Sequence, residues 1–178
     1  AWFYGRDVDT VVGDMDSLSP AYVERLEERG TIIVRHPTEK DETDLELALL
    51  YAAEQGATWI RVIGAIGGRF DQMLANVYLL GLPQLRDIDT AIVAGEQMIA
   101  LIRPDTHHLH GQIGDTLSLI PISGDVHGIV SEGLKYPLKE ETLIFGPARG
   151  ISNVIQSTDV TIHFETGLLL CVHTNGHA

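Results

Sequence analysis

Residues 11–20 read VVGDMDSLSP, which gives a strand end, a tight turn and a helix start in succession. Ser19 suits the N-cap of that helix and Pro20 suits its first position. The turn therefore holds Asp14 and Asp16 at the carboxyl end of a strand, the edge at which open α/β sheets bind ligands. Two carboxylates so close together suit an oxygen-ligated cation such as Mg²⁺. The alternative is an ordinary turn with two solvated aspartates.

The composition is that of a globular chain with a strong acidic excess. The chain has 178 residues, of which 44% are hydrophobic and 21% charged, and its formal net charge is −13. That charge argues against a broad nucleic-acid or acidic-membrane surface, and a phosphate-bearing ligand would need a local cation. No apolar run approaches the ~20 residues that span a membrane, and no signal peptide is visible. The single cysteine, Cys171, lies in an apolar run, which predicts a buried inert thiol and agrees with a cytoplasmic protein.

The first 95 residues alternate between strand-like and helix-like patterns. Thr43 and Glu46 form a capping box, which predicts that a helix begins at Asp44. The strands are expected over residues 9–12, 31–35, 59–63 and 90–94. A third helix is expected after a Gly-rich turn, and its inward-facing residues would be Phe70, Met73, Leu74, Val77 and Leu80. This alternation predicts an α/β domain over residues 1–95, with a parallel sheet covered by helices on both faces.

Two further turns of this domain place polar groups at a helix start. Asp44 either serves a ligand or only complements the helix dipole, an effect of ~0.3–1 kcal/mol. The Gly-rich turn over residues 64–69 offers backbone amides and Arg69 to phosphate oxygens, unless its glycines serve packing alone. If the strands form one sheet, both turns share a carboxyl edge with the 14–16 turn. Carboxylates, an arginine and free amides suit phosphoryl-type transfer, and the absence of a Walker A pattern excludes a P-loop enzyme.

The spacing of apolar residues changes near residue 95, after which no helical pattern is found. Short β-prone runs follow, separated by turn signals, over residues 98–102, 116–122, 126–130, 142–145, 160–164 and 168–172. This spacing predicts an antiparallel β-sandwich or barrel over residues 96–178. His108 and His110 would share a strand face, but no third ligand has a recognisable spacing to them, so a structural or surface role is favoured over zinc.

Taken together, the motifs resemble the thiamine pyrophosphokinase family. The matching stretches lie in the family's order over nearly the whole chain, at residues 13–17, 40–44, 67–72, 75–76, 118–121, 133–136 and 150–153. The resemblance implies transfer of a pyrophosphoryl group from ATP to the hydroxyethyl group of thiamine, with release of AMP. It also implies an α/β domain followed by a β-sandwich, working as a homodimer. We expect the first domain to lack the strand and the Asp-Gly-Gly nucleotide loop with which the family's domain begins.

The resemblance also implies roles for individual residues. Three carboxylates would hold Mg²⁺: Asp14, Asp16 and Asp44. Catalysis would fall to Asp16, Asp44, Arg69 and Asp71, with Asp71 as the candidate acceptor of the alcohol proton. ATP and its phosphates would contact Ser17, Asp41, Thr43, Arg69 and Gln72. Thiamine would lie between subunits, against Ser152, Asn153 and Tyr136, the last of which stands where some relatives carry Trp.

Two other functions use the same residues. A metal-dependent nucleotide phosphohydrolase would employ the same acids with water as the nucleophile. A non-catalytic nucleotide- or thiamine-binding protein would bind without turnover. Formation of AMP only in the presence of thiamine distinguishes the transferase from both.

Overall fold

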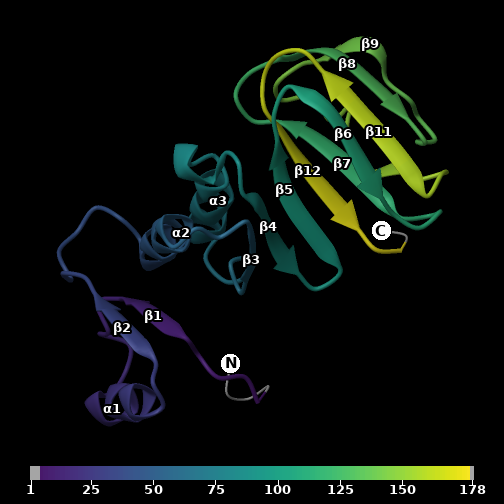
Figure 1. Ribbon diagram of the computed structural model, residues 1–178. Helices are drawn as coiled ribbons and strands as arrows, with labels where there is room; N and C mark the ends of the chain where they lie inside the picture. The colour runs from purple at the N-terminus through teal and green to yellow at the C-terminus, as the bar shows by residue number, and fades with distance from the viewer. Residues whose placement is uncertain (1–4, 177–178) are drawn as a thin grey trace. The chain divides into compact units, whose positions relative to one another are not determined.

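The computed structural model describes residues 5–176 (Figure 1). The chain divides into two compact units, which we describe separately. The first unit comprises Ala1–Trp59 and Leu82–Asp89, and the second comprises Ile60–Gly81 and Thr90–Ala178. No helix in residues 5–176 is long and apolar enough to cross a membrane.

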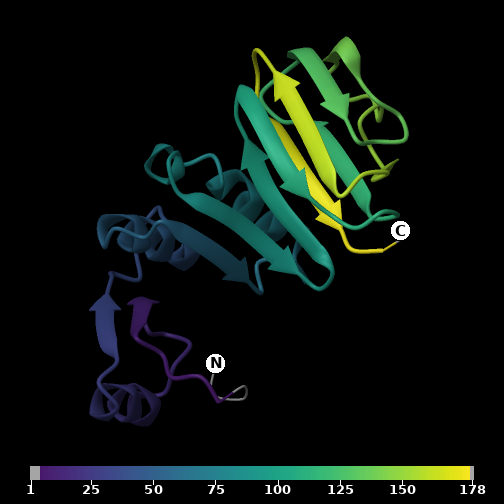
Figure 2. The same ribbon diagram turned by 45° about the vertical axis from the view of Figure 1, so that its right-hand side comes forward.

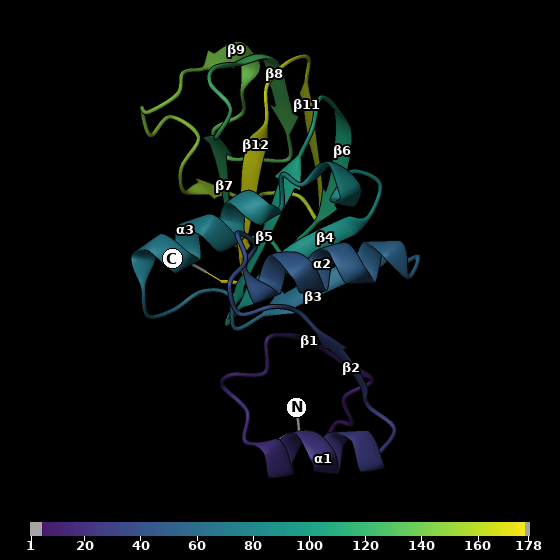
Figure 3. The same ribbon diagram turned by 90° about the vertical axis from the view of Figure 1, so that its left-hand side faces the viewer.

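The first unit is built around two parallel strands. Its elements are β1 (Thr10–Gly13), α1 (Pro20–Glu28), β2 (Ile32–Arg35), α2 (Asp44–Glu54) and the short 3₁₀-helix η2 (Pro83–Leu85). The register of β1 and β2 runs from Thr10 opposite Ile32 to Gly13 opposite Arg35, and Figure 3 shows α1 beside this pair. As the sequence predicts, Pro20 opens α1, and α2 begins at Asp44 with the Thr43 hydroxyl accepting the backbone N–H of Glu46 at 3.2 Å.

The second unit consists mainly of two stacked sheets (Figure 2). Its elements are β3 (Trp59–Ile63), α3 (Phe70–Leu79), β4 (Asp89–Ala94), β5 (Gln97–Ile102), β6 (Asp105–His110), β7 (Thr116–Pro121), β8 (Val126–Glu132), β9 (Lys139–Leu143), β10 (Asn153–Val154), β11 (Asp159–Phe164) and β12 (Leu169–Thr174). One sheet has the order β10-β7-β12-β5-β4-β3, and the other has the order β6-β11-β8-β9. The antiparallel strands that the sequence predicts after residue 97 are therefore present.

The core of the second unit lies between these two sheets. Both sheets contribute alternate residues to one buried apolar cluster, which includes Leu117, Leu119, Val126, Ile129, Ile162, Phe164 and Leu169. Cys171 belongs to this cluster, and burial raises the pKa of its thiol to about 12. The thiol is therefore protonated and inert, as its apolar neighbours in the sequence predict.

The strands of the first 95 residues do not form one sheet. Among the described residues β1 and β2 pair only with each other, whereas β3 and β4 belong to the six-stranded sheet. The two-residue turn after β4 places Ala94 opposite Gln97, so β4 pairs with the antiparallel strand β5 as well as with β3. Because apolar patterning identifies a strand but not its neighbour, this sorting was not predictable from the sequence. The boundary between residues 95 and 96 stays a prediction.

Two strands and two residues of α3 also differ from the prediction. The strands expected from the sequence did not include β6 and β10. In β6, exposed polar residues alternate with the less exposed His107 and Leu109. Phe70 and Leu74 were expected to face inward on α3, but both are exposed. Of the other expected inward residues, Met73 and Val77 are half-buried and Leu80 is buried, and the nearby side chain of Asn76 donates to the carbonyl of Ala65 at 2.8 Å.

A buried carboxylate ties the loop before β7 to the end of β12. Asp115 accepts the backbone N–H groups of Gln112 at 2.9 Å and Gly176 at 2.8 Å, and one of its oxygens lies 2.8 Å from Nε2 of His173. These hydrogen bonds, led by that of Gly176, lower the pKa of Asp115 from 3.8 to about 2. Such a shift corresponds to about 2 kcal/mol in favour of the folded state with Asp115 ionised.

We expect Asp115→Asn to lower the free energy of unfolding by about 2 kcal/mol at pH 7, because the amide turns a donor toward backbone donors. The folded-state pKa lies below the ordinary one, so the contribution is complete above about pH 4 and is lost as the pH falls toward 2. The difference between wild type and variant in urea unfolding should therefore shrink over that window. Asp87→Asn, at an exposed position, is the control. A difference that stays constant with pH would contradict this account.

Candidate active site

The turn after β1 holds its two aspartates in a constrained conformation. The backbone N–H of Asp16 donates to Oδ1 of Asp14 at 3.0 Å, and the N–H of Leu18 donates to the Met15 carbonyl at 3.1 Å. Between them Met15 has φ +65°, a conformation that costs a non-glycine residue free energy and that recurs at functional sites. The turn thereby fixes Asp14 in place, whereas Asp16 is exposed.

Lys40 joins Asp14 to the start of α2. Its ammonium nitrogen lies 2.9 Å from Oδ1 of Asp44 and 3.5 Å from Oδ2 of Asp14. The side chains of Lys40 and Asp14 are only 11% and 12% exposed, whereas that of Asp44 is 51% exposed. One cation therefore lies between two carboxylates in a largely desolvated position.

Gly13 makes room for this arrangement. A Cβ atom at Gly13 would lie 2.9 Å from Cγ of Asp44 and 3.0 and 3.1 Å from its two oxygens, which is too close. Gly13 also has φ +148°, which favours glycine. The positive φ favours glycine ahead of the acidic turn, and any larger residue would make the carboxylate of Asp44 shift from its position against this backbone.

The charges of this cluster reinforce one another. The backbone N–H of Asp16, with a further contribution from the Lys40 ammonium, holds the pKa of Asp14 below its usual range. The hydrogen bond to Asp44, together with the nearby Asp14 charge, raises the pKa of Lys40. Lys40 and Asp14 are therefore both ionised at neutral pH.

The predicted metal ligands are only partly brought together. Asp14 and Asp44 converge on one cation, but no group of three or more His, Cys, Asp or Glu side chains within residues 5–176 is arranged to hold a metal ion. The two carboxylates still fit a hard cation, because their oxygens are the donors that Mg²⁺ prefers and they already enclose a positive charge. Asp16 and the histidines of β6 stay outside this cluster.

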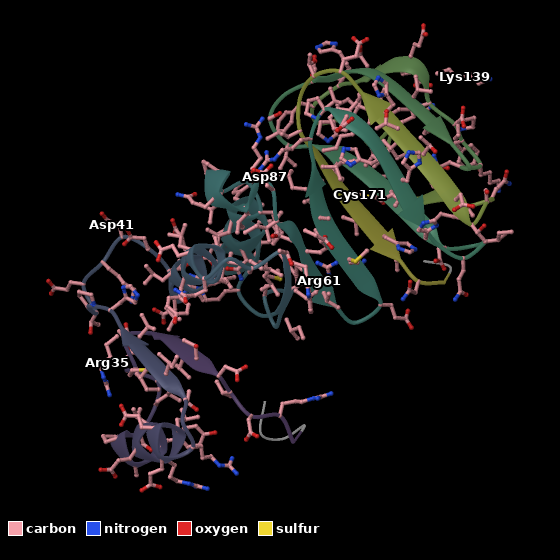
Figure 4. The ribbon with its side chains drawn as sticks, viewed as in Figure 1. Arg35, Asp41, Arg61, Asp87, Lys139 and Cys171 are labelled. Carbon is pink, nitrogen blue, oxygen red and sulfur yellow. The ribbon has the colours of Figure 1, made fainter. Side chains whose placement is uncertain are left out.

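The other predicted phosphate contacts of the first unit lie in its loops. Ser17 and Asp41 are both exposed, and Figure 4 shows Asp41 in the loop ahead of α2. The hydroxyl oxygen of Thr43 accepts the first free N–H of α2, so this side chain has a structural role as a helix cap. Whether these residues contact ATP stays a prediction.

In the second unit the Gly-rich turn presents an arginine that is already paired. Nε of Arg69 donates to Oδ1 of Asp71 at 3.1 Å, and Nη2 donates to Oδ2. Both side chains are exposed, as is Gln72 on the next position of α3. Arg69 lowers the pKa of Asp71, which makes its carboxylate a weaker base. The lowered pKa of Asp71 therefore favours a role in orienting Arg69 and argues against a role as the proton acceptor.

The predicted thiamine residues of the second unit have different surroundings. Asn153 is buried, and its Oδ1 accepts the backbone N–H groups of Tyr136 at 3.0 Å and Val154 at 2.9 Å, while its Nδ2 donates to the Tyr136 carbonyl at 2.7 Å. The side chain of Asn153 thus holds the backbone of Tyr136. Tyr136 itself is 54% exposed, with the Lys135 ammonium 5.4 Å from the centre of its ring.

Ser152 is a residue other than glycine with a positive φ, at +55°. Its backbone N–H donates to Oγ of Ser118 at 3.0 Å. The preceding Gly150 packs on β7 so closely that a Cβ atom would lie 2.2 Å from the Leu119 carbonyl oxygen. The Gly-Ile-Ser-Asn stretch is therefore fixed to β7 by backbone contacts, and the side chain of Ser152 belongs to an exposed residue.

Sequence reasoning missed the parts played by Lys40, Ser118 and Asn76. The i and i+4 spacing of Lys40 and Asp44 did not predict their ion pair, because Lys40 lies in the loop ahead of α2 and the spacing rule applies within a helix. Contact of Lys40 with Asp14, and of Ser118 with Ser152, depends on how separate segments pack and had no local signal.

Comparisons with known proteins agree with the motifs. The model for the thiamin pyrophosphokinase catalytic domain matches residues 3–92, and that for the thiamin pyrophosphokinase vitamin B1 binding domain matches residues 105–169. Thiamine pyrophosphokinase of Bacillus subtilis is 30% identical over 163 residues, which cover 91% of this chain and 76% of that protein. Thiamine pyrophosphokinase 3 of Oryza sativa is 31% identical over 183 residues, covering 96% and 67% respectively.

Solved structures give the same result. The crystal structure of thiamine pyrophosphokinase from Bacillus subtilis has a TM-score of 0.87 at 28% identity, covering 98% of this chain and 82% of that chain. The structure of thiamin pyrophosphokinase from Geobacillus thermodenitrificans has a TM-score of 0.78 at 32% identity, covering 91% and 75%. The two family models follow each other along this sequence in the order that its motifs predict. The chain therefore belongs to the thiamin pyrophosphokinase family.

Proposed function

We propose that this protein transfers a pyrophosphoryl group from ATP to thiamine, giving thiamine diphosphate and AMP. The observation that carries the proposal is the match of a catalytic-domain model and a vitamin B1 binding-domain model, in that order, over most of the chain. The charged cluster after β1 and the arginine before α3 fall in the first match, and Ser152 and Asn153 fall in the second. The phosphohydrolase and the non-catalytic binding protein are not favoured by any of these observations.

Asp14 and Asp44 would hold Mg²⁺, with Asp16 as the third carboxylate on the same turn. When bound, the ion supplies charge neutralisation along the triphosphate. The chain's own residues then orient the reaction. Arg69 presents a guanidinium fork that matches two phosphate oxygens, and its pairing with Asp71 limits the directions in which that fork can point.

Thiamine binding is assigned to the second unit. The exposed ring of Tyr136 offers a stacking surface, and Asn153 holds the backbone that carries it. Ser152 offers its hydroxyl from a backbone held by Ser118. We propose further that the protein is a homodimer in which thiamine lies between the second unit of one subunit and the carboxylates of the other. A cytoplasmic location agrees with the single buried thiol.

A coupled assay of AMP and thiamine diphosphate tests the reaction. We expect both products to form in equal amounts, and only when ATP, Mg²⁺ and thiamine are all present. Phosphate release from ATP without thiamine would identify a phosphohydrolase. Binding of thiamine or ATP without either product would identify a non-catalytic protein.

Gly13→Ala should lower kcat by about a hundredfold or more, because the new methyl group displaces the Asp44 carboxylate by a distance of order 1 Å. Gly56→Ala is the matched control. Gly56 has φ +79°, so its replacement strains the backbone in the same unit, yet a Cβ atom there meets nothing within 4 Å. Steady-state kinetics and thermal unfolding of both variants separate the two effects. Equal activity of the two variants would show that Asp44 need not pack against Gly13.

A shared site predicts recovery of activity in mixed dimers. Asp16→Asn should inactivate the carboxylate side, and Tyr136→Ala should raise the KM for thiamine while leaving the fold intact, because Tyr136 is exposed. In a twofold dimer the mixed species has one intact site, so an equimolar mixture after subunit exchange should regain about a quarter of wild-type activity at low thiamine. Mixed dimers, detected by mass, without regained activity would place thiamine within a single subunit.

A further inference from the structure

The ammonium group of Lys40 lies between the carboxylates of Asp14 and Asp44. We propose that Lys40 is a built-in counter-ion, which occupies the cation position between Asp14 and Asp44 in the free protein and is displaced when a divalent cation binds. The proposal rests on the proposed function only in taking these two carboxylates as metal ligands.

The first argument is desolvation. The side chain of Asp14 is 12% exposed, so its charge is poorly hydrated and needs a partner. The Lys40 ammonium lies 3.5 Å from Oδ2 of Asp14, and it reaches Oδ1 of Asp44 as well, at 2.9 Å. With the lysine removed, two carboxylates at this end of β1 would face each other without neutralisation, and one of them is largely buried.

The second argument is that a lysine and a metal ion exclude each other here. A divalent ion coordinated by a carboxylate lies about 2.0–2.1 Å from its oxygen if it is Mg²⁺. The ammonium already contacts the oxygens that would coordinate it, Oδ2 of Asp14 and Oδ1 of Asp44. Two positive charges on the same oxygens repel each other, and more strongly where Lys40 and Asp14 are shielded from water, so one has to leave.

The third argument is the side chain itself. Lysine is a point charge on a flexible four-carbon stem, and it can withdraw without moving the backbone. Lys40 lies in the loop between β2 and α2, ahead of the helix whose first residue it contacts. Lys40 would thus keep Asp14 and Asp44 in place in the free protein and release them on metal binding. The Arg69–Asp71 pair differs, because both of its side chains are exposed.

Lys40→Met tests the proposal with Mn²⁺ alone as the probe, in the absence of ATP and thiamine. We expect free Mn²⁺, measured by electron paramagnetic resonance, to report a Kd about tenfold lower than that of wild type, because the competing charge is gone. In EDTA the variant should unfold about 2–4 °C lower, and saturating Mn²⁺ should abolish that difference. Lys139→Met, on the exposed edge strand β9, is the matched control and should change neither quantity (Figure 4).

Two further variants keep the result decisive. Asp44→Asn added to Lys40→Met should remove the gain in Mn²⁺ affinity, which locates the gain at this cluster. Lys40→Arg retains the charge and adds a two-pronged contact to carboxylates, so it should weaken Mn²⁺ binding even if Lys40→Met fails to fold. Unchanged or weaker Mn²⁺ binding in Lys40→Met, or a gain that survives Asp44→Asn, would overturn the proposal. Failure of the pyrophosphoryl transfer assay is a separate result, since no measurement here involves turnover.

Discussion

The ion pairs of Lys40 are the interaction on which the candidate site of the first unit depends. They connect the turn after β1 to the first residue of α2, two segments that otherwise bring like charges together. Each side is prepared for this contact by local structure. The bare backbone of Gly13 admits the Asp44 carboxylate, and the Thr43 cap fixes where α2 begins and hence where Asp44 projects. A cation is what makes the resulting geometry stable.

Local features of the fold were predictable from the sequence because their causes are local. The Thr43 hydroxyl caps the start of α2 and Pro20 opens α1, although Ser19 makes no side-chain capping hydrogen bond. The partner of a strand is not a local property. Nothing in residues 59–63 or 90–94 indicates that β3 and β4 join the six-stranded sheet while β1 and β2 form a separate pair.

For the candidate site residues, too, the sequence locates each residue along the chain but does not show which groups it contacts. The sequence indicates that Asp14, Asp44 and Arg69 stand at turns before or after regular elements, and the structure places them there. Residue type alone does not show which polar side chains are free to meet a ligand. The contact of Asn153 with thiamine, which the family resemblance implies, stays a prediction, and in the structure its amide is engaged by the backbone of Tyr136 and Val154. Its role in the structure is to position Tyr136.

The charge balance explains why the site arranges its cations as it does. The chain carries a net charge of −13, and ATP adds further negative charge, so an excess of fixed acid would repel the substrate. In the structure Lys40 is paired with Asp14 and Asp44, and Arg69 is paired with Asp71. Each of the two units therefore presents paired charges in place of a strongly positive field. Under our proposal, a nucleotide would bring its own divalent cation, and that ion would displace Lys40 from Asp14 and Asp44.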